Sequence, residues 1–528
     1  MRLKLVFLTC FSLFSVTLFA QQQVLDRDVQ MIFSDHVFDR HENYHNAKSS
    51  HINYLLDSSF SKEIDQLKFK SFTFWLWNRV LNESYLDFQG KDYKVKVDPF
   101  YRLINGRELN LQRSSYHSRK GIMVNAQIGK RLSFSSFLIE GPVKGERFLD
   151  EYISATRVLP GEGIVKPEDG RYGNYYSFGT LSYKASDYIS FTAGHGKNFL
   201  GDGYRSLFLS DAAYSYPFAK MNLRFGGFVE YDAIVAEFID YSPDMAPPGD
   251  VLRRKKYGSF HYLNFKGNSN WTFGFFEGVI WAGDSTGRFN LDVNYLNPFT
   301  VFRPVEYNLG SPDNIMIGIH SKYLLGKSLD FYGQFLLTEF FAAELFARNK
   351  WWGNKLAYQL GLKLHNLPHL KNFYLQLEYN HIKPYTYNHG YSVTGISHNG
   401  QALAHPSGSN LKEGVAILNY RHKRWNYNLQ CNYKFSGLEE SDSTSIGTDV
   451  LRPYTERPRE YGVIIGQGIP YQQFYTNLKA SYIINPSNMM LFDIGITNRA
   501  EWIDGDERNS FMIYLGLRTG LTNFYADF

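Results

Sequence analysis

The chain contains almost no cysteine and, after its first twenty residues, no long apolar run. Its 528 residues include two cysteines, Cys10 and Cys431. Cys10 lies in the apolar leader, so removal of the leader would leave Cys431 without an intrachain partner and the protein without a stabilising disulfide. After residue 20 no stretch of about 18 apolar residues occurs, which excludes a membrane-spanning helix. If this chain crosses a membrane, it does so as a closed β-barrel.

An excess of charge of either sign is also missing. Lysine and arginine number 56 and aspartate and glutamate 51, which gives a formal net charge of +5. Nucleic-acid-binding surfaces ordinarily show a strong basic excess. We therefore expect no nucleic-acid partner.

The start of the chain has the three parts of a secretory signal peptide. Arg2 and Lys4 precede a mostly apolar run, which ends before three glutamines. We predict that residues 1–20 are a signal peptide and that the mature chain begins at Gln21. An alternative is a lipoprotein box that ends at Cys10, although the apolar region before it would be only about five residues long.

Aromatic residues are abundant, and they alternate with polar residues. Tyrosine and phenylalanine number 39 and 43. In residues 425–435 the odd positions are apolar or aromatic, whereas the even positions are Asn, Gln or Lys. Segments 355–365 and 371–380 alternate in the same way. Each is about as long as a tilted strand that crosses the hydrocarbon layer, with one face for lipid and the other for water.

These segments predict an all-β fold, a transmembrane antiparallel β-barrel. A soluble β-sandwich is the alternative, because its strands alternate as well. Extending the pattern along the chain gives eighteen strands, an even number, as in bacterial barrels. We place them at 93–103, 120–128, 131–141, 174–184, 187–195, 217–224, 228–241, 257–265, 270–282, 313–324, 328–340, 355–365, 371–380, 414–420, 425–435, 473–483, 487–497 and 511–521.

The lengths of the connections predict the orientation in the outer membrane. Short links alternate with long ones, and short turns belong to the periplasm while long loops face outward. We therefore predict a periplasmic N-terminal segment at 21–92, a barrel at 93–528, and both chain termini in the periplasm. The final Phe528 is typical of such barrels, although the alternation slips before it, which a bulge or a short periplasmic tail would explain. The larger outside loops are predicted at 142–173, 197–216, 283–312, 381–413 and 436–472.

No motif for catalysis or cofactor binding is evident. The glycine-rich stretch 194–203 lacks the Gly-Lys-Ser/Thr ending of a phosphate loop. His389, His398 and His405 do not have the spacing of a zinc site, and there is no Gly-x-Ser-x-Gly elbow. We expect no catalytic residue, no metal and no cofactor.

The long loops are rich in aromatic, amide and arginine side chains. Planar rings with hydrogen-bonding groups beside them suit the faces and hydroxyls of sugars. An alternative for each single residue is that it only folds the loops over the barrel mouth. The predicted carbohydrate contacts are Trp351, Trp352, Tyr385, Tyr387, Arg452 and Arg457.

Several strings resemble the capsule assembly protein Wzi family of outer-membrane barrels. They are GDGYRSLFLSDAA at 201–213, NPF at 297–299 and DNIMIGI at 313–319. Other strings are similar to the Bacteroidetes branch, which includes the gliding motility protein RemB. These are PYTYNH at 384–389, HNGQALAHP at 398–406 and REYG at 459–462.

The resemblance covers roughly residues 190–528 and implies a function as well as a fold. It implies an eighteen-stranded, non-enzymatic barrel whose outer surface attaches exopolysaccharide in the manner of a lectin, with a role in motility in the gliding branch. We therefore predict an outer-membrane protein that binds or anchors surface polysaccharide. Two alternatives stay open. One is a transport channel, because eighteen strands enclose a wide lumen; the other is a docking subunit that binds motility or secretion proteins through residues 21–92.

Overall fold

The structure is a computed structural model, and it describes residues 27–34, 58–168, 170–241, 253–283, 291–520 and 522–528. The predicted signal peptide, residues 1–20, and the predicted start of the mature chain, Gln21, lie outside the described residues. Among the described residues, no helix is long and apolar enough to cross a membrane.

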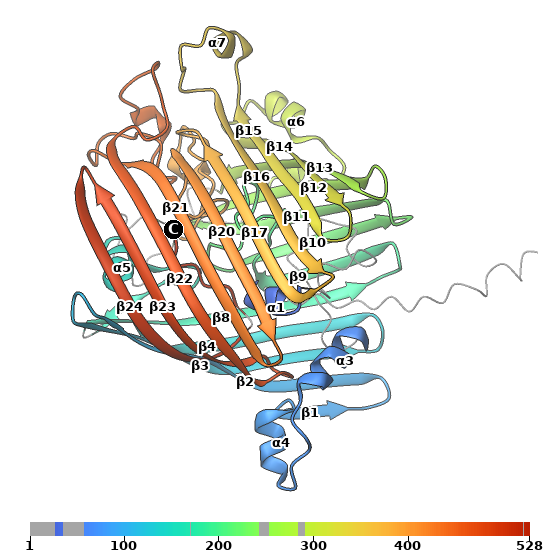
Figure 1. The fold of residues 1–528 in the computed structure, drawn as a ribbon. Coiled ribbons are helices and arrows are strands. Elements are labelled where there is room, and N and C mark those ends of the chain that lie inside the picture. The colour runs from blue at the N-terminus through green and yellow to red at the C-terminus, as the bar shows by residue number, and fades with distance from the viewer. Residues whose placement is uncertain (1–26, 35–57, 169, 242–252, 284–290, 521) are drawn as a thin grey trace, which may run out of the picture.

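The largest sheet has twenty strands, and eighteen of them form one closed antiparallel wall (Figure 1). The wall closes where β2 (Tyr93–Glu108) pairs with β24 (Asp506–Thr519), with Arg102 opposite Arg518. Each predicted strand corresponds to one of the eighteen, so the predicted fold class is confirmed. The other strands are β3 (Arg113–Ile128), β4 (Leu132–Lys144), β8 (Arg171–Lys184), β9 (Ile189–Gly196), β10 (Tyr216–Phe225), β11 (Val229–Asp240), β12 (Arg254–Lys266), β13 (Trp271–Ala282), β14 (Asn314–Leu325), β15 (Leu329–Glu339), β16 (Lys355–Leu367), β17 (Leu370–Ile382), β20 (Leu411–His422), β21 (Trp425–Leu438), β22 (Ile469–Asn485) and β23 (Met490–Ile503).

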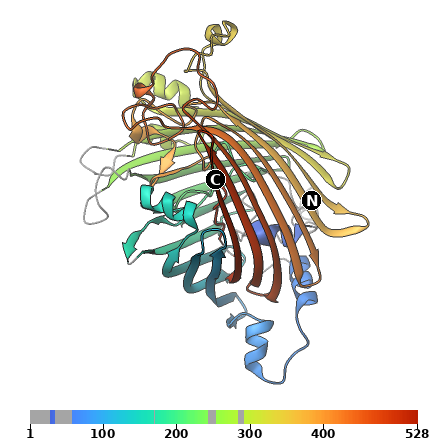
Figure 2. The ribbon, with the colours of Figure 1, turned by 60° about the vertical axis from the view of Figure 1, so that its left-hand side comes forward.

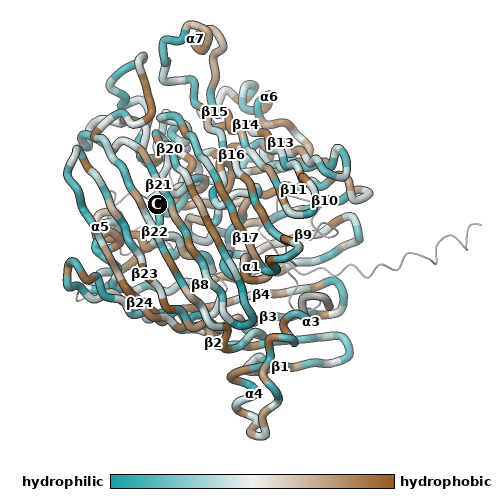
Figure 3. The backbone as a smooth tube through the Cα atoms, viewed as in Figure 1, coloured by the Kyte–Doolittle hydropathy of each residue, from teal (hydrophilic) through white to brown (hydrophobic). Residues whose placement is uncertain are grey.

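Hydrophobic and hydrophilic residues alternate along the strands of this wall (Figure 3), and successive side chains of a strand face opposite sides. Leu418, Leu429 and Leu478 are register partners on neighbouring strands and lie on the outer face. Next to them Asn419 and Asn428 are buried on the inner face. The period of two in the sequence therefore predicted the facing correctly, because each strand separates an apolar environment from a polar one.

The two ends of the barrel differ in their connections. At one end, the turn end, strands are joined by tight turns such as 129–131 and 423–424; at the other, the loop end, most connections are long. The loop-end connections contain the short elements α5 (Arg147–Thr156), β5 (Val158–Leu159), β6 (Gly163–Ile164), β7 (Lys166–Glu168), η2 (Val293–Leu296), α6 (Phe302–Leu309), α7 (Ala342–Phe346), η3 (Ser392–Thr394), β18 (Ser397–His398), β19 (Gln401–Ala402) and η4 (Tyr454–Glu456).

Two of the predicted outside loops fold into the barrel instead of lying outside it. The segments 197–215 and 383–410 contribute buried side chains to a core shared with inward-facing residues of the wall. Phe208 stacks on Phe276 of β13 with ring centroids 4.5 Å apart, and Tyr387 donates a hydrogen bond to the carbonyl of Leu207 at 3.2 Å. The physical reason is that these loops carry enough apolar residues to fill the lumen from within.

The chain beyond β24 also enters the lumen. Residues 522–528 turn back from the end of the strand, and Asp527 accepts hydrogen bonds from Gln430 and Asn432 on the inner face of β21, both at 2.7 Å. The end of the chain, which the sequence placed in the periplasm, is therefore buried among lumen residues. This return of the chain, and neither a bulge nor a periplasmic tail, accounts for the slipped alternation before Phe528.

The described residues before the wall lie inside the barrel or at its turn end (Figures 1 and 2). Helix α1 (Arg27–Ile32) sits inside the barrel, where Val29 and Ile32 pack against Ile483 and Leu491. Helices α3 (Ser58–Leu67) and α4 (Trp75–Leu81) lie at the edge of the wall, and β1 (Leu86–Gln89) pairs with β2. Part of the segment predicted at 21–92 is thus a plug for the turn end.

Candidate functional site

Three loop-end segments, 340–354, 383–410 and 439–468, are joined by one aromatic cluster. We call this assembly the outer cap. The ring of Trp352 lies at its centre, with its centroid 4.7 Å from that of Tyr454 and 6.0 Å from that of Tyr385. The guanidinium carbon of Arg457 lies 3.9 Å from the Trp352 centroid, and the indole N–H donates to Glu460 at 2.6 Å. One residue thereby links all three segments.

The structure buries three of the six predicted carbohydrate contacts. Tyr385 and Tyr387 are fully buried and Trp352 is nearly so. The Tyr385 hydroxyl donates to the carbonyl of Ser445 at 2.8 Å, and burial raises its pKa to about 12. In this structure the loops therefore use these rings as their own small core, and a contact of the rings with sugar stays a prediction.

The two predicted arginines hold the outer cap together. Arg452 donates to the carbonyl of Thr444 at 2.9 Å and to the carboxylate of Asp442 at 3.2 Å. Arg457 donates to the carbonyl of Tyr454 at 3.0 Å and pairs with Glu460. Both side chains stay partly exposed. Both arginines therefore have a structural role in the outer cap, and their contact with sugar stays a prediction.

Exposed rings and a cation remain on the surface of the outer cap. Tyr391 and Tyr461 are exposed, Trp351 is half-buried and Arg459 is exposed; we call these four residues the outer rim. Trp351, Arg459 and Tyr461 lie on paired segments, because the N–H of Val463 donates to the carbonyl of Lys350 at 3.0 Å. The segment of Tyr391 is joined to them through the N–H of Tyr454, which donates to the carbonyl of His389 at 3.0 Å. Sequence reasoning named only Trp351 among them. The sequence did mark two of the others, because Arg459 and Tyr461 lie in the string REYG, which carries part of the family resemblance.

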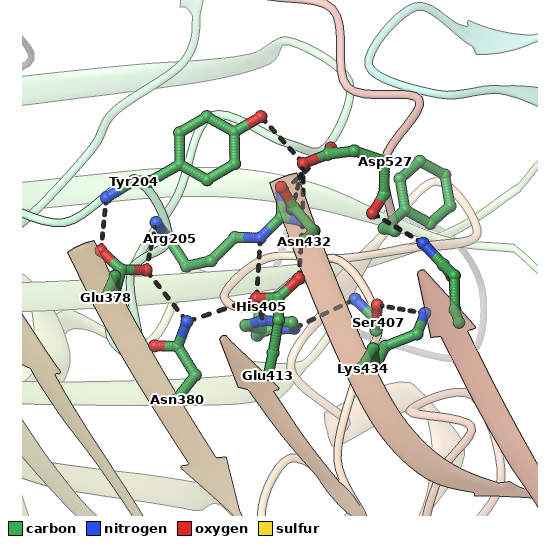
Figure 4. A network of polar contacts seen from close by, with 12 residues as sticks. Tyr204, Arg205, Glu378, Asn380, His405, Ser407, Glu413, Asn432, Lys434 and Asp527 are labelled. Carbon is green, nitrogen blue, oxygen red and sulfur yellow. Dashed lines mark hydrogen bonds and ion pairs between the residues drawn. The ribbon is translucent and has the colours of Figure 1, made fainter. Parts of the chain in front are cut away.

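Below the outer cap a network of buried charges ties the lumen segments to the wall (Figure 4). Arg205 donates to Glu413 of β20 at 2.9 Å and to Asp527 at 3.0 Å. His405 lies 2.9 Å from the same Glu413. A buried charge is costly unless it is paired and hydrogen-bonded. The inner faces of β17 and β20 therefore hold segments 197–215, 383–410 and 522–528 in one arrangement.

The charge states in this network follow from burial and from the paired groups. Burial opposes the charge of Arg205, but the carboxylates of Asp527 and Glu413 hold its pKa well above its ordinary value. Burial lowers the pKa of His405, although Glu413 acts in the opposite direction. The guanidinium is therefore a fixed charge around which the lumen segments are arranged.

The glycines of the GDGYR string allow a close approach to the wall. A side chain at Gly203 would lie 2.3 Å from the carbonyl oxygen of Arg205 and 2.6 Å from Gln359. Next to it the backbone N–H groups of Tyr204 and Arg205 donate to Glu378 of β17, at 2.6 and 3.0 Å. The string thus needs glycine for packing against a carboxylate of the barrel wall.

The loop histidines each have a separate partner. His389 hydrogen-bonds to Thr394 at 2.6 Å, and His398 accepts from the N–H of Ile239 at 3.0 Å. In the part of the chain that the structure describes, no group of three His, Cys, Asp or Glu side chains is placed to hold a metal ion. That the chain has no catalytic residue and no cofactor stays a prediction.

This architecture defines a class: the solved structures that share it are outer-membrane β-barrels. One is Escherichia coli Wzi, described as an outer membrane protein involved in group 1 capsule assembly and as a carbohydrate-binding β-barrel. It matches with a TM-score of 0.52 at 12% identity, over 96% of this chain and 100% of that chain. Pseudomonas aeruginosa OprD matches with a TM-score of 0.43 at 11% identity, over 81% and 96%. Acinetobacter baumannii OccAB4 gives 0.42 at 8%, over 82% and 98%.

These likenesses concern the fold. No family model matches the chain, and no curated protein matches it. The predicted resemblance to the Wzi family is supported for the barrel architecture, and the Bacteroidetes branch with RemB stays a prediction.

Proposed function

We propose that this protein attaches surface polysaccharide to the outer membrane through its outer rim, by binding and without turnover. The observation that carries the proposal is the arrangement of the loop end: a cross-linked cap presents exposed rings and a cation, while the lumen beneath is occupied by the chain itself. The carbohydrate binding described for the Wzi barrel, whose full length this fold matches, supports the same conclusion.

The outer rim has the chemistry that a polysaccharide requires. Tyrosine and tryptophan rings offer flat apolar area with a polar edge, and Arg459 supplies donors for sugar hydroxyls or for acidic sugars. Each contact is weak, but a long polymer engages several barrels or several rings at once, so the effective concentration holds it at the surface. Trp352, Tyr385, Tyr387, Arg452 and Arg457 then keep the outer cap in place and contribute to binding through it.

The filled lumen supports a binding role over an open channel. Segments 197–215, 383–410 and 522–528 are anchored inside by buried ion pairs and stacked rings. Opening a wide aqueous path would require these contacts to break. A closed barrel is suited to holding a ligand at its surface.

The proposal includes an orientation. Residues 1–20 direct export, the turn end with the described part of residues 21–92 faces the periplasm, and the outer cap faces outward. A role in gliding, with motility or secretion proteins bound at the turn end, would extend this function. It is supported by the similar strings at 384–389, 398–406 and 459–462.

The experiment compares an outer-rim variant with the parent protein. In the variant Trp351, Tyr391 and Tyr461 become alanine and Arg459 becomes glutamine. We expect the barrel to stay inserted and heat-resistant, because the strand ladder sets wall stability, while cells retain less polysaccharide. Retention is measured by surface staining and by binding of polysaccharide purified from the parent cells to the protein in vesicles.

The matched control replaces Leu345 and Phe346 by alanine. These side chains are exposed on α7, at the same end of the barrel but outside the outer rim. We expect this variant to retain polysaccharide like the parent. If the outer-rim variant folds normally and retains as much polysaccharide as the control, attachment through the outer rim is wrong.

A further inference from the structure

One loop-end segment lies on the outside of the barrel wall instead of over the lumen. Residues 291–309 contain η2 and α6, and we call them the wall segment. Its two fully buried rings, Tyr295 and Phe302, belong to a cluster with strand residues of β12, β13 and β14. The strand members of this cluster are Tyr257, Val279, Trp281 and Ile315.

These strand residues face away from the lumen. On β12 and β13 the lumen-facing positions are even-numbered, because Tyr262 and Phe276 pack against Phe208 inside the barrel. Side chains alternate along a strand, so the odd positions, among them Tyr257 and Trp281, point outward. Farther along the same face Leu263, Phe275 and Ile317 are exposed. The wall segment therefore covers part of the surface that the neighbouring strands present to lipid.

Polar groups of the outer face receive the wall segment. Glu277 on β13 points outward and accepts hydrogen bonds from the backbone N–H groups of Phe302 and Arg303, at 2.7 and 3.4 Å. The hydroxyl of Tyr231 donates to the carbonyl of Pro298. A carboxylate on a lipid-facing wall is costly without such partners. The docked segment thus supplies hydrogen-bond partners to both of these groups on the outer face.

The opposite side of the wall segment has exposed apolar side chains. The exposed fractions are 74% for Val293 and Phe299, 60% for Val301 and 80% for Tyr307. Tyr257 and Trp281 lie toward the loop end of the outer face, where aromatic side chains of barrels ordinarily meet the membrane interface. Here the wall segment covers them and presents its own rings in their place.

We propose that the wall segment is embedded in the outer leaflet of the membrane and that Val293, Phe299, Val301 and Tyr307 contact lipid. Lipid is the occupant because the exposed side chains continue the lipid-facing surface of β12–β14 on which the segment rests. Arg303 is exposed as well, and a charged group beside apolar ones is typical of helices that lie in the membrane interface. The proposal rests on the barrel fold and not on polysaccharide binding.

The experiment measures the surroundings of single nitroxide labels in protein folded into phospholipid vesicles. In a background with Cys10 and Cys431 replaced by alanine, cysteine is introduced at Val301 or Tyr307. The lipid reference is Leu478→Cys on the outer face, and the water reference is Asp442→Cys in an exposed loop. Collision with molecular oxygen reports lipid, and collision with a water-soluble nickel complex reports water.

We expect the labels at positions 301 and 307 to favour oxygen over nickel severalfold more than the label at position 442 and to approach the ratio at position 478. A ratio equal to that at position 442 would place the segment in water and overturn the proposal. Protection from both reagents would also overturn it, because a protein partner and not lipid would then cover the surface. Heat-resistant migration of each variant verifies that the barrel has folded.

Discussion

Replacing Arg205 by methionine tests whether the buried charges hold the lumen segments. In the parent protein this guanidinium donates to Glu413 at 2.9 and 3.2 Å and to Asp527 at 3.0 and 3.3 Å. The methionine side chain fills similar space but leaves two buried carboxylates without their cation. Breaking a buried pair in this way costs about 3–5 kcal/mol.

This free energy is lost from the docking of the lumen segments and not from the stability of the wall. The hydrogen-bonded ladder around Glu413 connects β17, β20 and β21 independently of Arg205. A loss of about 3–5 kcal/mol shifts the equilibrium between docked and undocked segments by about a hundredfold to a few thousandfold. We therefore expect a folded barrel with a loosened lumen.

Hydrogen–deuterium exchange read by mass spectrometry measures the two parts separately. We expect faster exchange in peptides that cover 198–213 and 522–528, while the strands and the heat-resistant migration stay unchanged. Arg508→Met is the matched control, because Arg508 is exposed and its guanidinium lies 4.0 Å from the exposed carboxylate of Glu151. Adding Glu413→Gln and Asp527→Asn to Arg205→Met should restore part of the protection. Unchanged exchange in both peptides would refute the anchoring role of Arg205.

Three further predictions concern acid, lipid and topology. Burial lowers the pKa of His398 to about 3, so its contribution to stability is complete above about pH 6.5 and is lost as the pH falls toward 3; exchange in residues 396–404 should rise over this range, and His398→Gln should flatten the rise. Leu429→Arg on the outer face should cost ~2–4 kcal/mol in lipid vesicles, and Leu429→Ala much less; equal costs would contradict the facing. An epitope tag at Asp442 should bind antibody on intact cells, whereas a tag at Lys423 should require permeabilised cells; the reverse result would invert the topology.

The wall of this barrel could be predicted from the sequence because each strand faces two different solvents. The alternation over 425–435 follows from that contrast, and it fixes both the strand and its facing. The pairing of β2 with β24 could also be predicted from the sequence, because a closed barrel with an even number of antiparallel strands makes the first and last strands neighbours.

The interior could not be predicted in the same way. Segments 197–215 and 383–410 have no regular period, so nothing in their pattern separates a loop that fills the lumen from one that faces water. Tyr385 illustrates this difficulty: it has a positive φ of 65°, and only the three-dimensional structure shows its ring beneath Trp352. The aromatic residues of the loops predicted a sugar-binding surface. In the structure Trp352, Tyr385 and Tyr387 form the core of the loops, whereas Tyr391 and Tyr461 are exposed.

Helix α1, which lies inside the turn end of the barrel, also affects how the barrel closes. Strands β2 and β24 come from opposite ends of the wall sequence, and bringing them together carries the entropic cost of closing a very long loop. The backbone N–H of Arg27 in α1 donates to the side chain of Asn523 at 2.7 Å, across 496 positions of sequence. Asn523 closely follows β24, whereas Arg27 lies well before β2, with α3, α4 and β1 between them. Once this contact forms, the loop that must close to bring the two seam strands together is much shorter, so part of the closure entropy is already lost before the strands pair. A segment that blocks the finished pore would thereby speed the formation of the wall around it.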